Sequence, residues 1–123
     1  MRSFLTLLMI PLYALAQSPI PTEFPADAVP ASADDLRGRI SGKTYKVKLA
    51  DGNTWRLEYK ANGFAFINTS RGFHDTGKWR VEDTKLCSDW QKAPGDCSET
   101  RVKGEAIYVK RSSNGEVIVL SLD

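Results

Sequence analysis

The clearest pattern in the chain is an alternation of apolar and polar residues that begins after residue 42. Apolar side chains occupy every second position in Tyr45-Lys-Val-Lys-Leu49, and again in Trp55-Arg-Leu-Glu-Tyr59 after Asp51-Gly52. A period of two residues is typical of β-strands with one face buried and the other in water. Because Asp-Gly between two such runs favours a tight turn, residues 45–60 are predicted to form a β-hairpin.

Short apolar runs separated by turn residues continue to the end of the chain. No helical pattern between them is long enough to cross over between parallel strands, so consecutive strands are predicted to pair antiparallel. We expect an all-β domain with about seven or eight strands in a meander, whose sheet is curled or closed into a small barrel of lipocalin-like appearance. The further strands are predicted at residues 64–67, 78–82, 86–87, 99–103, 106–110 and 117–120.

Large aromatic residues are the expected fillers of this barrel. They are Trp55, Tyr59, Phe64, Phe66 and Trp79. Because five such rings occupy most of the interior of a barrel of about eight strands, we expect little free volume inside. A small apolar ligand held in the barrel, as in lipocalin-like carriers, remains an alternative. The last strand is apolar on both faces, which indicates a central strand or one that lies beneath a helix.

One short helix is predicted before the strands, over residues 32–42. Ser32 can accept hydrogen bonds from the first turn, and Gly42 can adopt the left-handed conformation that often follows a helix. Leu36 and Ile40 lie four positions apart and therefore share one face. A helix this short is marginal in water, so we expect it to pack across one end or one open edge of the sheet.

The first 16 residues resemble a secretory signal peptide. Arg2 precedes an apolar stretch over residues 4–15, and Ala14 and Ala16 supply the small residues that signal peptidase requires. We expect cleavage between Ala16 and Gln17 and a periplasmic or secreted protein. A retained membrane anchor is disfavoured, because the stretch is shorter than the roughly 20 residues of a span. The protein is therefore not expected to be an integral membrane protein.

The next segment, residues 17–31, contains four prolines and has no helical or strand periodicity. Proline-rich segments of this kind favour extended structure. We interpret the segment as an extended linker between the signal peptide and a single β-domain over residues 32–123. Recognition by a proline-binding groove is the alternative.

The only two cysteines, Cys87 and Cys97, lie ten positions apart in the sequence. An exported protein meets oxidising conditions, so they are predicted to form one disulfide. The chain has no C-x-x-C motif and no second cysteine pair, which disfavours a redox or metal site. We therefore expect no metal and no cofactor.

Composition limits the classes of partner. The formal net charge is only +2 and hydrophobic residues make up 41% of the chain, which favours a folded domain without a polyanion-binding tail. Basic residues on the outward strand faces are interleaved with glutamates, and an exported protein does not meet nucleic acid. No nucleic acid partner is expected, while an anionic envelope glycan remains an alternative.

Several short motifs occur together in this chain. They are Gly77-Lys-Trp79-Arg-Val81, Leu86-Cys87-Ser-Asp-Trp90 and the second cysteine, Cys97. In this order they resemble small exported proteobacterial proteins of a family of unknown function. The resemblance implies a small β-domain with one disulfide, and it implies no activity.

Residues for catalysis are scarce. His74 is the only histidine, with Asp75 beside it and Ser70 four positions before, but no nucleophile elbow is present. We therefore expect a monomer that is not an enzyme and that presents loops to an envelope protein. The candidate binding residues lie in two predicted loops and are Trp90, Phe73, His74 and Arg71; Trp90 can equally be a core residue.

Overall fold

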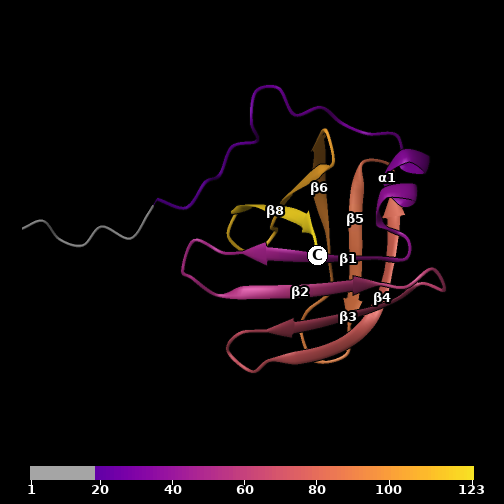
Figure 1. The fold of residues 1–123 in the computed structure, drawn as a ribbon, viewed down its shortest axis with the longest axis vertical. Coiled ribbons are helices and arrows are strands. Elements are labelled where there is room, and N and C mark those ends of the chain that lie inside the picture. The colour runs from indigo at the N-terminus through magenta and orange to yellow at the C-terminus, as the bar shows by residue number, and fades with distance from the viewer. Residues whose placement is uncertain (1–18) are drawn as a thin grey trace, which may run out of the picture.

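The computed structural model describes residues 19–123, so the predicted signal peptide and its cleavage position lie outside the described residues. The described chain folds into a closed antiparallel barrel in the order β1 to β8 (Figure 1), which confirms the predicted all-β meander. A helix, α1 (Ala33–Ile40), precedes it. The strands are β1 (Lys43–Lys48), β2 (Thr54–Tyr59), β3 (Phe64–Thr69), β4 (His74–Glu82), β5 (Lys85–Trp90), β6 (Asp96–Lys103), β7 (Ala106–Lys110) and β8 (Val117–Leu122).

Pairing of the first and last strands closes the barrel. Tyr45 on β1 lies opposite Leu122 on β8, and Lys46 lies opposite Ser121. Closure removes free sheet edges, which otherwise offer unpaired backbone groups to other chains. Along each strand the side chains alternate between the interior and the outer surface, as the period of two residues predicts.

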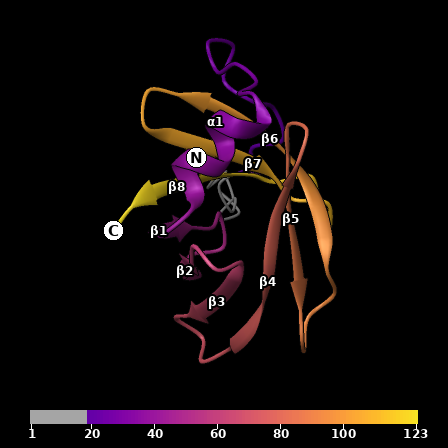
Figure 2. The same ribbon diagram turned by 90° about the vertical axis from the view of Figure 1, so that its right-hand side faces the viewer.

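The helix α1 closes one end of the barrel (Figure 2). The Ser32 side chain accepts a hydrogen bond from the Asp35 N–H at 3.2 Å, and Gly42 has a φ of 75°, so both predicted helix boundaries are confirmed. Leu36 and Ile40 are both 0% exposed. The Tyr45 hydroxyl donates to the Arg39 carbonyl at 2.5 Å and connects β1 with the end of the helix.

The proline-rich segment lies against the barrel. Val29 and Val102 exchange two backbone hydrogen bonds, of 2.9 and 2.7 Å, and Val117 donates its N–H to Pro21 at 2.7 Å. The Arg101 guanidinium stacks over the Phe24 ring at 5.0 Å. The segment is extended, but its contacts with β6 and β8 make it part of the folded unit rather than a free spacer.

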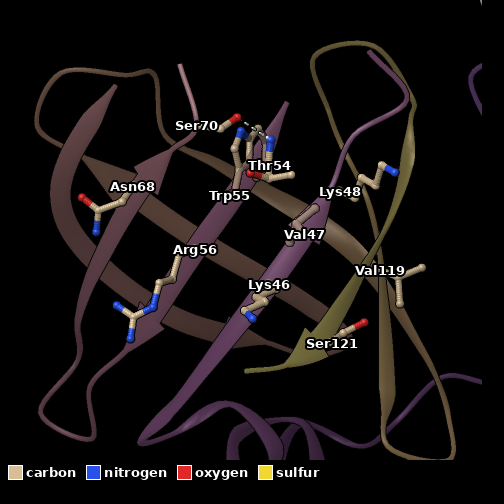
Figure 3. Close-up of a pocket in the computed structure, with 10 residues that line it drawn as sticks. All are labelled: Lys46, Val47, Lys48, Thr54, Trp55, Arg56, Asn68, Ser70, Val119 and Ser121. Carbon is tan, nitrogen blue, oxygen red and sulfur yellow. Dashed lines mark hydrogen bonds between the residues drawn. The ribbon is translucent and has the colours of Figure 1, made fainter. Parts of the chain in front are cut away.

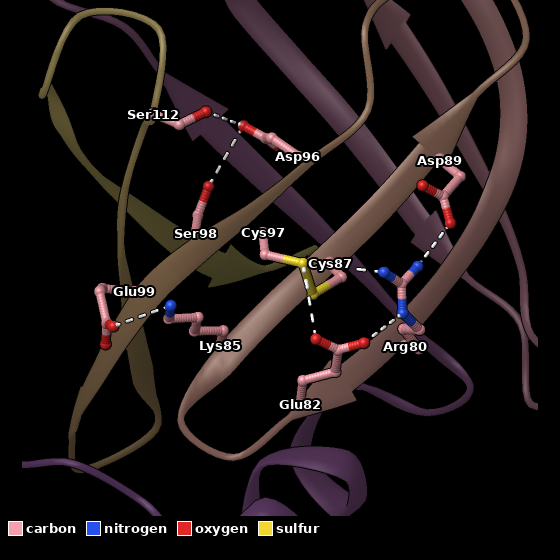
Figure 4. Close-up of a disulfide and its surroundings, with 10 residues drawn as sticks. All are labelled: Arg80, Glu82, Lys85, Cys87, Asp89, Asp96, Cys97, Ser98, Glu99 and Ser112. Atoms are coloured by element: carbon pink, nitrogen blue, oxygen red, sulfur yellow. Dashed lines mark hydrogen bonds and ion pairs between the residues drawn. A yellow bond between two sulfur atoms is a disulfide. The ribbon is translucent and has the colours of Figure 1, made fainter.

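The predicted disulfide joins Cys87 on β5 to Cys97 on β6. The two residues are direct partners in the strand register, with their Cα atoms 3.9 Å apart. The sequence placed both cysteines at the ends of a loop, whereas β5 continues to Trp90 and only residues 91–95 connect the strands. The disulfide therefore fastens two paired strands to each other on their outer face (Figure 4).

The interior is not filled by the five predicted aromatic residues. Phe64 is 43% exposed and Phe66 lies on the same outward face of β3, while Ala65 points into the barrel. Ala65 pairs with Gly77 on β4, where an added Cβ would lie 2.2 Å from the Asp89 carbonyl oxygen. A cavity of about 680 Å³ remains inside the barrel, so the prediction of a filled interior is wrong.

Candidate functional site

A cavity of about 680 Å³ opens at the end of the barrel opposite α1. The loops β1–β2, β3–β4, β5–β6 and β7–β8 surround its mouth. Its deeper wall is apolar and comes from inward-facing residues of five strands. These are Leu57, Ile67, Leu86, Val109, Ile118 and Leu120.

Aromatic side chains form the upper part of the cavity. Trp55 on β2 and Trp90 at the end of β5 both line it, and Phe73 lies at the rim. Trp90 is the direct partner of Gly77 on β4, where the backbone of β5 comes too close for any side chain. Trp90 is therefore a half-buried wall residue at the end of a strand rather than part of a loop.

Polar groups gather on one wall of the cavity, where β5 pairs with β6. Ser88 is the direct partner of Asp96, and Ser98 follows two positions along β6. The Asp96 carboxylate accepts hydrogen bonds from the hydroxyls of Ser98, at 3.4 Å, and of Ser112 (Figure 4). Cys87 precedes Ser88, and Cys97 lies between Asp96 and Ser98. The disulfide on the outer face therefore fastens together the two strands that carry this polar wall.

Tyr59 faces this wall from the opposite side, because β2 and β6 lie four strands apart in a barrel of eight. The residue is only 3% exposed, and its hydroxyl has no hydrogen-bond partner within residues 19–123. Every fully enclosed side-chain nitrogen or oxygen in the described chain has a hydrogen-bond partner. Because the Tyr59 hydroxyl has none, it is not fully enclosed and opens onto the cavity. Burial, with Tyr45 and Asp96 nearby, raises the pKa of Tyr59, which keeps the hydroxyl protonated as a donor.

Two arginines stand at the mouth, and each has a carboxylate partner. Arg71 binds Asp51 at 3.1 Å, and Arg111 binds the buried Glu116 at 3.2 Å. The Arg111 guanidinium also lies 4.9 Å over the ring of Trp55. The first pair joins the β3–β4 loop to the β1–β2 loop, and the second lies within the β7–β8 loop.

Asp75 fixes the β5–β6 loop from inside the barrel. Its carboxylate accepts backbone N–H groups of Lys92 and Ala93 at 2.9 Å each, and of Thr76 at 2.8 Å. Desolvation acts to raise the pKa of Asp75, but the three N–H donors and the Lys92 charge together hold it below its ordinary value. The loop that carries part of the cavity rim is therefore held by a charged carboxylate.

The residues considered for catalysis do not come together. His74 lies on the outer surface, where its Nδ1 contacts the Asn68 side chain. Asp75 points inward and accepts the three backbone N–H groups described above. The Ser70 hydroxyl donates to the Asn53 side chain at 2.9 Å. Of the candidate binding residues, Trp90, Phe73 and Arg71 line the cavity, whereas His74 does not.

One group of side chains in the described chain lies close enough together to hold a metal ion: Glu82, Cys87 and Cys97. Both cysteine sulfurs are bonded to each other, so neither is available as a thiolate ligand. This group does not fit a metal ion while the disulfide is intact.

A second hollow, of about 560 Å³, lies on the outer side of β8, β1, β2 and β3 (Figure 3). Two of its three cations are already paired: Lys46 binds Asp123 at 2.9 Å, and Arg56 binds Asp123 at 3.0 Å and also contacts Glu58. These contacts weaken the case for an anionic glycan on this face.

Comparisons with protein-family models, with curated proteins and with solved structures found no match. No helix within residues 19–123 is long and apolar enough to cross a membrane. Sequence reasoning did not single out Tyr59, Ser88 and Asp96 as site residues. The alternation places Tyr59 inside the barrel, but no motif marks the facing serines.

Proposed function

We propose that this protein binds a small ligand inside the barrel and has no catalytic role. The observation that carries this proposal is the open cavity with Trp55, Trp90 and Tyr59 in its wall. Its volume of about 680 Å³ falls within the range of roughly 300–1,000 Å³ of small-molecule sites. An apolar floor with a few convergent polar groups is also the usual composition of such sites.

The N-terminal sequence and the disulfide support a role outside the cytoplasm. Disulfides persist in oxidising compartments, and residues 1–16 have the pattern of a cleaved signal peptide. Together they favour a periplasmic or secreted binding protein, one that stores or carries its ligand.

A second candidate function is presentation of the open-end loops to an envelope protein. Phe73, which is 41% exposed at the cavity rim, favours it, because exposed aromatic residues often anchor protein interfaces. The two candidates differ in one respect: only a ligand carrier requires a cavity that a ligand can enter.

Binding of the neutral fluorescent probe N-phenyl-1-naphthylamine tests the cavity. We expect saturable binding with one site, which Val109→Phe abolishes because Val109 points into the cavity. Val119→Phe is the matched control, because Val119 lies on the outer side of β8 and should leave binding unchanged (Figure 3). Thermal unfolding of both variants verifies the fold, and equal binding by folded Val109→Phe would refute the proposal.

A further inference from the structure

The geometry points to a more specific ligand: a small aromatic molecule with a protonated amine, whose ammonium group binds the Asp96 carboxylate. This inference rests on the proposed function, because it assigns the ligand class of the same cavity. It combines three features of the cavity wall: a carboxylate, hydroxyl groups without a hydrogen-bond partner, and aromatic rings.

Asp96 supplies the charge. Three charged residues line the cavity, Arg71, Asp96 and Arg111, and both arginines have carboxylate partners. Asp96 has no cationic partner within 4.0 Å in residues 19–123, and only serine hydroxyls donate to it. A carboxylate with neutral donors retains acceptor capacity, and an ammonium group with three N–H donors matches it.

Tyr59 and Ser88 supply the free hydroxyls. Both side chains are at least nine-tenths buried and line the cavity, and neither hydroxyl has a hydrogen-bond partner in the described chain. Buried polar groups in folded proteins are almost always paired, so water or a ligand must complete these hydroxyls. Because Ser88 is the strand partner of Asp96, a ligand amine at the carboxylate lies next to the Ser88 hydroxyl, and the Tyr59 hydroxyl faces it across the cavity.

Trp55 and Trp90 favour an aromatic body. Tryptophan offers the strongest ring face for cations and stacks well with other rings. One face of Trp55 already carries the Arg111 guanidinium, which leaves Trp90 as the more available indole. A ligand with an aromatic ring near Trp90 and an amine at Asp96 would satisfy both sets of groups at once.

An anionic ligand fits less well. It would place its charge near Asp96, and it could bind Arg71 or Arg111 only in competition with Asp51 or Glu116. Glu116 is buried and also accepts the Ala50 N–H at 3.0 Å, so displacing it from Arg111 would leave a buried charge without its cation.

Three indole probes that differ only in their terminal group test the inference by titration calorimetry. Tryptamine carries an ammonium, indole-3-propionate a carboxylate, and tryptophol a neutral hydroxyl. We expect tryptamine to bind at least about tenfold more tightly than indole-3-propionate, with tryptophol between them. The preference should weaken at high salt, because Asp96 is exposed at the mouth.

Substitution of the carboxylate completes the test. Asp96→Asn should weaken tryptamine about tenfold and leave tryptophol within twofold; the control Asp89→Asn removes an outward-facing carboxylate of β5 and should change neither. If indole-3-propionate binds as well as tryptamine, or if Asp96→Asn weakens both ligands equally, the amine inference is wrong while cavity binding stands. If the indoles and the neutral probe all fail to bind, the proposed function itself is wrong.

Discussion

Two tyrosines inside the barrel, Tyr45 and Tyr59, are equally buried but differ in their hydrogen bonding. At the closed end, the Tyr45 hydroxyl donates to the Arg39 carbonyl, and the Trp79 indole N–H donates to the Lys60 carbonyl at 2.8 Å. Tyr59 packs edge to face against both of these rings, but its hydroxyl opens onto the cavity and has no partner in the described chain, although Tyr59 is as deeply buried as Tyr45. Residue type and burial are therefore alike, and only the hydrogen bonding differs.

This difference separates residues that stabilise the fold from residues that can bind a ligand. Buried polar atoms in folded proteins are almost always paired, so those that open onto an unfilled cavity indicate where a further molecule completes the structure. Closed-end substitutions should chiefly lower stability, and open-end substitutions should chiefly lower binding.

The largest loss of stability is expected at the closed end. Leu36→Ala should lower the free energy of unfolding by about 2–5 kcal/mol, because Leu36 is 0% exposed and its truncation leaves a void between α1 and the barrel. Urea unfolding followed by circular dichroism measures the loss. Probe binding by the folded variant should be unchanged, and a loss below about 1 kcal/mol would show that α1 is not an integral part of the core.

Removing the disulfide should have the next largest effect. The double variant Cys87→Ser, Cys97→Ser should lose about 2–4 kcal/mol of unfolding free energy, since the bond restricts the unfolded chain. Reduction of the wild-type protein should produce the same loss in urea unfolding. Thiols that react freely in the folded, oxidised protein would contradict the predicted disulfide.

Trp90→Ala should affect binding more than stability. We expect at least a tenfold loss in affinity for the neutral probe, because a tryptophan in a binding site commonly contributes about 2 kcal/mol. His74→Ala is the control: His74 is exposed outside the cavity and should leave affinity within about twofold. Equal effects of the two substitutions would mean that the binding site lies elsewhere.

The smallest effect concerns pH and the β5–β6 loop. The pKa of Asp75 is lower in the folded than in the unfolded state, so its contribution is fully present above the unfolded value, about 3.9, and disappears as pH falls through the folded value. Wild type should therefore be more stable than Asp75→Asn at neutral pH, and the difference should shrink in acid. Urea unfolding of both proteins across this range measures it; a difference independent of pH would contradict the assignment.

The sequence predicts the fold well because its signals are local. Alternation, turn residues and the Ser32 cap each depend on a few neighbouring positions, and the structure confirms the strands and the helix that they predict. Phe64-Ala-Phe-Ile67 is apolar at every position, so periodicity could not show that Phe64 and Phe66 face outward. Proline content likewise gave no indication that Val29 pairs with Val102.

The cavity was harder to predict than the fold because it depends on non-local pairing. Its apolar wall combines inward-facing residues of strands that are distant in the sequence, and its polar wall results from Ser88 pairing with Asp96. Such pairs are fixed by strand register, which no single motif records. Trp90, Phe73 and Arg71 were identified because exposed aromatic and arginine residues near turns are common in binding sites, whereas Tyr59 had the pattern of an ordinary core residue.

The three tryptophan indole N–H signals offer the most direct test of ligand binding in the cavity. In an ¹⁵N-correlated NMR titration with tryptophol, the signals of Trp55 and Trp90 should shift together with a single affinity, because both line the cavity. The Trp79 signal should stay in place, because its N–H is bonded to the Lys60 carbonyl outside the cavity lining. If Trp55 and Trp90 do not move, or if Trp79 moves as far as they do, the cavity at the open end is not the binding site.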